Sequence, residues 1–261
     1  MLVAVHQGPA KGDLTVSIVR AAAAGAELLL FPEMATTGYH IGADIPRLAE
    51  PADGATALAV AGLAREHGIA VAYGYPERDG DAVFNAVQLI GHGGDRLANY
   101  RKTHLFGALD RDWFTPGEHA VVQVELRGIR VGLLICYDVE FPELVRAHAL
   151  AGTDLLLTPT ALMTPYEVVA DTLVPARAYE SQLYLAYANH TGRERELRYC
   201  GRSCVIAPTG QVLARAGEDE QLLLADVDVD LLRASRAANT HLADRRPELY
   251  RDLVTPEGVT A

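Results

Sequence analysis

Cys136 is well placed for covalent chemistry, because it lies between a predicted strand and a predicted helix. Residues 131–135 form a short apolar run, and Pro142 suits the first turn of a helix that continues through Leu144 and Val145. Free backbone N–H groups at the amino end of a helix carry partial positive charge, which favours the reactive thiolate. The pattern therefore predicts a thiol nucleophile, although a lone cysteine after an apolar strand can also be a small core residue.

Two more reactive side chains follow strand-like segments. Glu33 comes just after the apolar residues 28–31, and a carboxylate there can act as a general base. Lys102 follows residues 99–101 and leads into a glycine-containing loop, where an ammonium can stabilise an oxyanion. Taken singly, Glu33 could cap a turn and Lys102 could be a solvated loop charge. Because ligands collect at the carboxyl ends of strands in α/β folds, the three together predict one active site.

The segments that must position these side chains alternate between strand and helix patterns, which is typical of a layered α/β fold. Strands are predicted at residues 2–7, 27–31, 69–75, 83–90, 121–126, 131–135, 154–158, 183–188, 204–207 and 221–227. Helices are predicted at residues 14–24, 55–66, 142–151 and 167–181, with Pro175 kinking the last helix or marking its inner boundary. We predict one domain over residues 1–261, with its core at about 2–250 and a loosely held tail from about Thr255.

The segments around the three reactive residues resemble the nitrilase superfamily of carbon–nitrogen hydrolases, whose Glu, Lys and Cys triad occurs in the same order. The similar strings are Phe31-Pro-Glu-Met, Tyr100-Arg-Lys-Thr-His-Leu-Phe, Ile135-Cys-Tyr-Asp, Thr158-Pro-Thr, Arg177-Ala-Tyr-Glu and Ala188-Asn. The resemblance implies a four-layer α-β-β-α sandwich that commonly pairs with a second subunit. We therefore expect a homodimer or a larger homo-oligomer.

By this resemblance, Cys136 is the nucleophile, Glu33 the general base and Lys102 the cation that stabilises the tetrahedral intermediate. The backbone N–H of Tyr137 would be a second donor to the oxyanion. Members of the family often have a glutamate shortly before a Pro-Gly turn. Asp110 is the better match here, but its shorter side chain leaves it without an assigned role.

The residues after the nucleophile indicate the amidase branch, because Tyr137-Asp138 stands where true nitrilases have Trp-Glu. Longer strings that begin at Thr37, Tyr73 and Met163 are similar to 5-aminopentanamidase and to stereoselective aliphatic amidases. We therefore expect a small linear aliphatic primary amide to be hydrolysed to carboxylate and ammonia through a thioester. Its far end could carry an amine or guanidinium, as in 5-aminopentanamide.

Other functions would use the same residues. An N-carbamoyl amidohydrolase or a nitrilase would need the same triad, whereas a catalytically dead binding protein is disfavoured because all three positions are filled. Tyr39, Tyr137, Thr160 and Tyr166 neighbour the predicted strand ends and are candidate substrate contacts, with structural packing as the alternative. The charged residues 193–198 are predicted to form a solvated loop.

Composition excludes several other classes. A net charge of -11, from 23 basic and 34 acidic residues, does not provide the excess of positive charge that binding to nucleic acid or to an anionic membrane requires. Cys136, Cys200 and Cys204 neither pair evenly nor form a metal set, so we expect no metal and no other cofactor. The chain starts without a basic and apolar leader and has no run of membrane length, which predicts a cytoplasmic protein in a reducing compartment.

Overall fold

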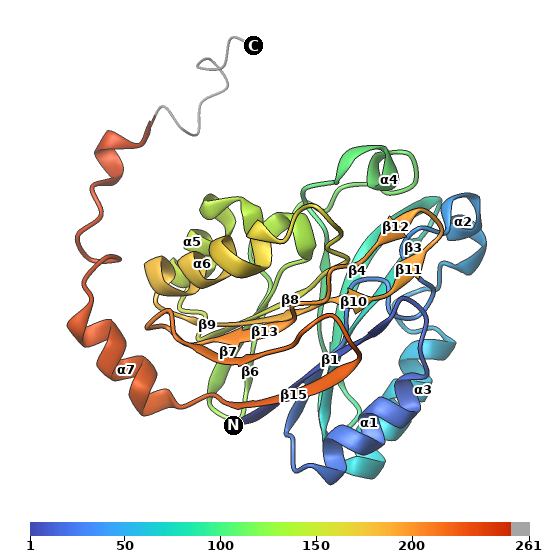
Figure 1. Cartoon of the computed structure of the whole chain (residues 1–261), viewed down its shortest axis with the longest axis horizontal. Coiled ribbons are helices and arrows are strands. Elements are labelled where there is room, and N and C mark those ends of the chain that lie inside the picture. The colour runs from blue at the N-terminus through green and yellow to red at the C-terminus, as the bar shows by residue number, and fades with distance from the viewer. Residues whose placement is uncertain (252–261) are drawn as a thin grey trace.

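A computed structural model describes residues 1–251 and contains two β-sheets stacked between two pairs of helices (Figure 1). The predicted tail from Thr255 lies outside the described residues. The first sheet has the order β10-β1-β2-β3-β4-β5, and β15 pairs with β1. Its strands are β1 (Leu2–Pro9), β2 (Leu28–Leu30), β3 (Ala70–Asp79), β4 (Ala82–Ile90), β5 (Arg96–Arg101), β10 (His190–Thr191) and β15 (Gln221–Asp226).

The second sheet has the order β14-β13-β9-β8-β7-β6, and β11 and β12 form a separate hairpin. The strands of the second sheet are β6 (Gln123–Leu126), β7 (Ile129–Leu133), β8 (Leu155–Pro159), β9 (Tyr184–Ala188), β13 (Cys204–Ile206) and β14 (Val212–Arg215). The hairpin consists of β11 (Arg193–Glu194) and β12 (Leu197–Arg198).

Two pairs of helices cover the outer faces of the sheets (Figure 1). They are α1 (Leu14–Ala23) and α3 (Ala55–His67) on the first sheet, and α5 (Pro142–Leu150) and α6 (Val174–Ser181) on the second. The other α-helices are α2 (Ile45–Leu48), α4 (Gly107–Arg111) and α7 (Val229–Ala238). Turns of 3₁₀ helix occur at Gly42–Asp44, Cys136–Glu140 and Pro247–Leu249, and a π-helical turn at Val169–Leu173.

The four layers form because successive side chains of the central strands are buried on opposite faces of the sheet. On β2, Leu28 and Leu30 enter the core between the sheets, whereas Leu29 belongs to the core beneath α1 and α3. Successive side chains of a strand point to opposite faces, so a strand that is apolar at every position is buried on both faces. The predicted four-layer α-β-β-α sandwich is confirmed.

Several predicted elements differ from the observed ones. The predicted helix over residues 167–181 is a π-helical turn followed by α6, and Pro175 lies in the first turn of α6, as one of the two sequence alternatives placed it. Helix α7 was not predicted, and only Leu232 and Ser235 of its residues are buried. None of the helices formed by the described residues is long and apolar enough to span a membrane.

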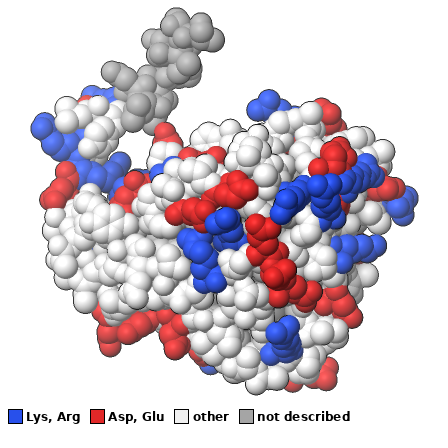
Figure 2. Space-filling view, viewed as in Figure 1, with Lys and Arg blue, Asp and Glu red and all other residues white. Residues whose placement is uncertain are grey.

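Acidic and basic side chains are interspersed on the face of the molecule seen in Figure 2. Exposed pairs such as Arg198 with Glu218, 2.9 Å apart, join some of them. Pairs of this kind contribute only about 0–1 kcal/mol each, because water screens them. The apolar core between the sheets, not the surface charge, therefore stabilises the fold.

Candidate active site

The three predicted catalytic residues lie just beyond the carboxyl ends of three strands. Glu33 follows β2, Lys102 follows β5 directly, and Cys136 follows β7. Strands β2 and β7 run parallel to their neighbours β3 and β8, which brings their carboxyl ends to the same edge of each sheet. Glu33 N–H donates to the Thr160 carbonyl oxygen at 3.4 Å, which connects the two sheets at this edge.

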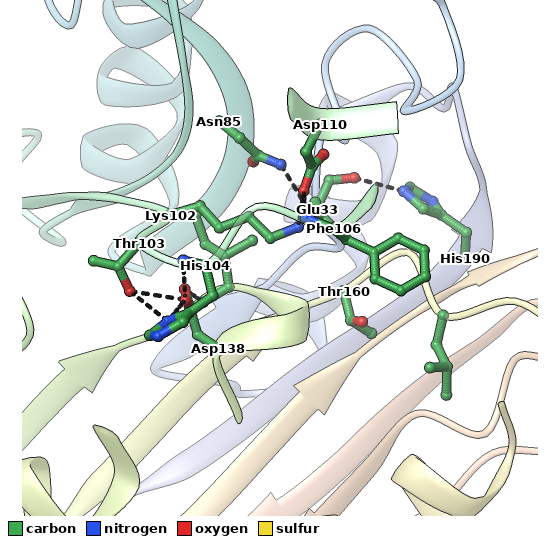
Figure 3. Close-up of polar contacts among 12 residues, drawn as sticks. Glu33, Asn85, Lys102, Thr103, His104, Phe106, Asp110, Asp138, Thr160 and His190 are labelled. Carbon is green, nitrogen blue, oxygen red and sulfur yellow. Dashed lines mark hydrogen bonds and ion pairs between the residues drawn. The ribbon is translucent and has the colours of Figure 1, made fainter. Parts of the chain in front are cut away.

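A buried ion cluster occupies this edge (Figure 3). Lys102 Nζ lies 2.7 Å from Glu33 Oε1 and 2.6 Å from Asp110 Oδ2, and all three side chains are fully buried. Asn85 Nδ2 donates to Glu33 Oε1 at 2.6 Å, and Phe106 N–H donates to Asp110 Oδ2 at 2.8 Å. These bonds fix the ammonium between two carboxylates, so Lys102 is not a solvated loop charge.

The electrostatics of the cluster favour a charged lysine and a basic glutamate. Burial alone would lower the pKa of Lys102, but the carboxylates of Asp110 and Glu33 raise its pKa well above the ordinary value. Burial raises the pKa of Glu33, and the adjacent Lys102 only partly opposes this. Within residues 1–251, Glu33 Oε2 is buried without a hydrogen-bond partner. That oxygen can therefore accept a proton.

Cys136 adopts an uncommon backbone conformation, with φ of 47°. Positive φ in a residue other than glycine carries strain, and such residues cluster at functional sites. Cys136 opens the short 3₁₀ turn Cys136–Glu140, and the α-helix begins only at Pro142. The turn presents the half-buried cysteine at the end of the strand segment.

The predicted helix-stabilised thiolate is wrong. Burial and the nearby Glu33 raise the pKa of the Cys136 thiol well above its ordinary value, although Lys102, the Thr160 hydroxyl and the Ala161 N–H act in the opposite direction. The raised pKa favours the thiol form, so a base must take its proton before the sulfur can attack.

Asp138 joins the lysine loop to the cysteine turn. Its buried carboxylate accepts hydrogen bonds from Tyr100 Oη at 2.8 Å, Thr103 Oγ1 at 2.9 Å and the backbone N–H of His104 at 2.9 Å (Figure 3). It also accepts from the backbone N–H of Ile135, the residue before the nucleophile, at 3.2 Å. One carboxylate thus sets the distance between the segments that carry Lys102 and Cys136.

The backbone of Glu33 is held as firmly as its side chain. His190 Nε2 donates to the Glu33 carbonyl oxygen at 2.6 Å. On β3, a Cβ at Gly74 would lie 2.8 Å from Glu33 Cα and 2.5 Å from Met34 N, so only glycine allows the strand to approach this closely. The position of the carboxylate is therefore fixed from both sides.

Two of the four candidate substrate contacts lie beside the ion cluster. Tyr39 is 3% exposed, and the centroid of its ring lies 5.7 Å from Lys102 Nζ. Thr160 is buried, and its Oγ1 lies 3.0 Å from Tyr187 Oη. Tyr39 therefore lies next to Lys102, and Thr160 lies next to Glu33, whose N–H donates to the Thr160 carbonyl oxygen.

The other two candidates flank Phe106, which the sequence did not single out. The ring centroids of Tyr137 and Tyr166 lie 5.3 Å and 6.1 Å from that of Phe106, both edge to face. Tyr166 is 45% exposed, which places it at the rim. An open cleft of about 360 Å³ lies alongside, with Thr103, Tyr137 and Phe141 among its lining residues.

A second hollow, of about 410 Å³, lies around Arg101 on the edge strand β5. The guanidinium of Arg101 is already paired with Glu77 at 2.6 Å and with Asp79 at 2.8 Å. The charged group at the centre of this hollow is therefore already neutralised within the protein. Among the described residues, no group of three or more His, Cys, Asp or Glu side chains could hold a metal ion.

Residues 10–237 match the family model described as carbon-nitrogen hydrolase. The chain belongs to the carbon–nitrogen hydrolase family. It is 50% identical to a Pseudomonas protegens protein described as a hydrolase in the pqqF 5' region, over 97% of this chain and 92% of that protein. It is 37% identical to an (R)-stereoselective amidase of a Pseudomonas species, over 89% of this chain and 84% of that enzyme.

Solved structures of amidases have the same fold as this carbon–nitrogen hydrolase. The amidase of a Nesterenkonia species superimposes with a TM-score of 0.87 at 36% identity, covering 97% of this chain and 96% of that chain. A glutamate-to-glutamine variant of the amidase from Nesterenkonia sp. AN1 carries acrylamide added to its active-site cysteine, with a TM-score of 0.87 at 35% identity, over 97% of this chain and 100% of that one. The family resemblance drawn from the sequence is confirmed.

Proposed function

We propose that this carbon–nitrogen hydrolase is a cysteine-dependent amidase that converts a small linear aliphatic primary amide to carboxylate and ammonia. The observation that carries the proposal is the buried Lys102, held by Glu33 and Asp110 after the end of β5, together with Cys136, which adopts a positive φ after the end of β7 in the other sheet. Relatives named amidases, and the active-site cysteine of the Nesterenkonia enzyme, support the same reaction class.

In the first step, Glu33 Oε2 takes the proton of the Cys136 thiol as the sulfur attacks the amide carbonyl. The raised pKa of Glu33 suits this role, because a more basic carboxylate takes the proton more readily. Glu33 then passes the proton to the amide nitrogen, the carbon–nitrogen bond breaks, and ammonia leaves. A thioester between the acyl group and Cys136 remains.

In the second step, water attacks the thioester and gives a proton to Glu33. The carbon–sulfur bond breaks, the acid product leaves, and the proton returns to the sulfur. In both steps the oxyanion lies against Lys102 and the Tyr137 N–H, and each such donor contributes on the order of 100-fold or more in rate. Lys102 Nζ donates to Asp110 Oδ2 at 2.6 Å, and we propose that Asp110 holds Lys102 in place and charged.

The pH dependence of kcat/KM should follow Glu33. The reaction requires the carboxylate form, and the pKa of Glu33 is raised above its ordinary 4.5 by burial. Activity should therefore fall as pH decreases through a value above 4.5, while Lys102, with its raised pKa, stays charged at neutral and moderately alkaline pH. Initial rates from pH 4 to pH 9 would measure this. An acid limb at or below the ordinary glutamate value would contradict Glu33 as the base.

The acyl group is best determined by ammonia release from a panel of substrates. The panel holds 5-aminopentanamide, 4-guanidinobutanamide, pentanamide, acetamide, the matching nitriles and N-carbamoyl amines. We propose that primary amides react fastest, with the cationic amides favoured. Faster turnover of N-carbamoyl amines, with carbon dioxide released as well, would replace this assignment with a carbamoyl hydrolase that uses the same residues.

We further propose that the protein assembles as a homodimer or a larger homo-oligomer. Helices α5 and α6 lie next to each other on the outer face of the second sheet and expose Leu150 and Tyr179, at 52% and 46%. Exposed apolar side chains of this size suit an isologous contact. Light scattering coupled to size-exclusion chromatography would measure the assembly, and a monomer at micromolar concentration would contradict it.

A further inference from the structure

The hairpin of β11 and β12 turns one of its charges into the protein, although its sequence predicts a solvated loop. Glu194 Oε2 accepts hydrogen bonds from the backbone N–H groups of Tyr39 at 3.1 Å and His40 at 2.8 Å, and from Tyr199 Oη. Glu194 is half-buried, whereas the side chain of Glu196, two residues later, is 74% exposed. Glu196 Oε1 lies 3.6 Å from His40 Nε2 at the surface, whereas Glu194 binds the backbone of residues 39 and 40.

Packing at Gly38 shows how closely the carboxylate and the loop fit together. Gly38 has φ of 91°, and a Cβ at this position would lie 2.2 Å from Glu194 Oε1. Only glycine tolerates both the conformation and the contact. Burial, and after it the nearby Glu194, raises the pKa of Tyr199, so its hydroxyl remains a donor to the carboxylate. Three donors thus converge on one oxygen of Glu194.

This contact lies directly behind the inner part of the active site. Tyr39, whose N–H it binds, is buried with its ring 5.7 Å from Lys102 Nζ. The side chains of Glu33 and Lys102 are held through Asn85 and Asp110. The ring of His190, which binds the Glu33 carbonyl, has its centroid 5.1 Å from that of Tyr199, and this contact links Glu194 to the cluster. A change at Glu194 should therefore act first on Tyr39, while Asn85 and Asp110 keep the side chains of Glu33 and Lys102 in place.

We propose that Glu194 is a positioning residue that fixes Tyr39 against the acyl part of the substrate and so sets which acyl chains the site accepts. The inference rests on the proposed amidase function, because Tyr39 is a substrate contact only if the amide binds beside Lys102. It concerns substrate binding more than the bond-breaking step. The hairpin thereby acts as the outer support of the acyl pocket.

The test compares Glu194→Gln with Glu196→Gln, the matched change at the exposed glutamate of the same hairpin. The carbonyl oxygen that remains in Glu194→Gln can still accept from the three donors, but it carries no charge, so the substitution weakens all three bonds at nearly constant shape. We expect KM for pentanamide to rise about 5- to 20-fold, with kcat and the KM for acetamide changed less than about twofold. Glu196→Gln should match wild type in all three values.

A double-mutant cycle separates positioning of Tyr39 from a general effect on the fold. If Glu194 acts through Tyr39, adding Glu194→Gln to Tyr39→Ala should change KM for pentanamide by less than about twofold. Full additivity of the two changes would overturn the proposal. So would equal losses for acetamide and pentanamide, because these indicate damage to the whole site.

Two further outcomes keep the test decisive. If Glu194→Gln does not fold, Tyr199→Phe removes one of the three donors at constant ring shape and should raise KM for pentanamide about 3- to 10-fold; an unchanged KM would overturn the inference. If wild-type enzyme releases ammonia from no amide, the proposed function fails. If wild type is active and Glu194→Gln behaves as Glu196→Gln does, only the positioning role of Glu194 fails.

Discussion

Replacing Cys136 by alanine is expected to lower kcat/KM for every accepted amide by roughly 10⁶-fold, the scale seen when a nucleophile is removed from a hydrolase. The alanine cannot form the thioester, and water in the same place would have to attack the amide unaided. The loss should fall on kcat, because Cys136 acts on the carbonyl and not on the rest of the acyl chain. Ammonia release under substrate saturation measures it.

The matched control is Cys204→Ala, which removes a thiol from the core strand β13. Cys204 is fully buried and free of disulfide bonds. This change should reduce stability through the small cavity it leaves but keep kcat within about twofold. Comparable losses in the two variants would show that the loss in Cys136→Ala reflects packing, and the proposed nucleophile would then be wrong.

Replacing Lys102 by methionine is expected to damage both activity and stability. Lys102 is fully buried between Glu33 Oε1 and Asp110 Oδ2, so its removal leaves two carboxylates without a cation. Removing one partner of a buried ion pair costs about 3–5 kcal/mol, and protonation of a carboxylate would limit this cost. Loss of the oxyanion donor should lower kcat at least about 100-fold. Urea denaturation and saturating kinetics measure the two effects.

Lys11→Met supplies the control, because Lys11 is exposed and carries the same change of side chain. It should shift the free energy of unfolding by less than about 0.5 kcal/mol and leave kcat unchanged. If Lys102→Met unfolds at the same urea concentration as Lys11→Met and keeps its kcat, Lys102 neither neutralises the buried carboxylates nor stabilises the oxyanion.

The apolar strands at the centre of the fold could be predicted because their residues are buried on both faces. Residues 83–90 and 154–158, for example, correspond closely to β4 and β8. Strand β5 was harder to predict from the sequence, because it lies at a sheet edge and its residues include Arg96, Asn99 and Arg101. Apolar periodicity reports burial, so half-exposed edge elements leave little signal.

The catalytic side chains were predictable by type, but their partners were not. Asp110 was noted in the sequence without a role, and Asn85 lies inside a strand where an amide has no obvious function. Both contact the cluster only because β4 and α4 are brought to Glu33 and Lys102 in the fold. The Asn85 contact joins residues 52 apart in the sequence, and Asp110, eight residues after Lys102, reaches it through the turn into α4, so apolar periodicity predicts neither contact.

One expectation failed and another held only in part, for the same physical reason. The thiolate at Cys136 was predicted from its place before a helix. Residues 193–198 were predicted to be solvated, and four of the six are exposed, but Glu194 is half-buried. In both cases burial determines the state of the side chain. Desolvation raises the pKa of the Cys136 thiol. The hairpin brings the Glu194 carboxylate against the backbone N–H groups of Tyr39 and His40, away from water. A local sequence pattern predicts which groups are present but not how much water reaches them.

The most direct test of this account is to locate the acyl group during turnover. Wild-type enzyme would be mixed with saturating pentanamide and quenched in acid, and its peptides analysed by mass spectrometry; a parallel reaction would contain hydroxylamine, which converts a thioester to a hydroxamate. We predict an acyl group on Cys136, and hydroxamate formation that is absent from Cys136→Ala. An acyl group on Cys200, Cys204 or any other residue, or ammonia release with neither an adduct nor hydroxamate, would contradict the thioester mechanism.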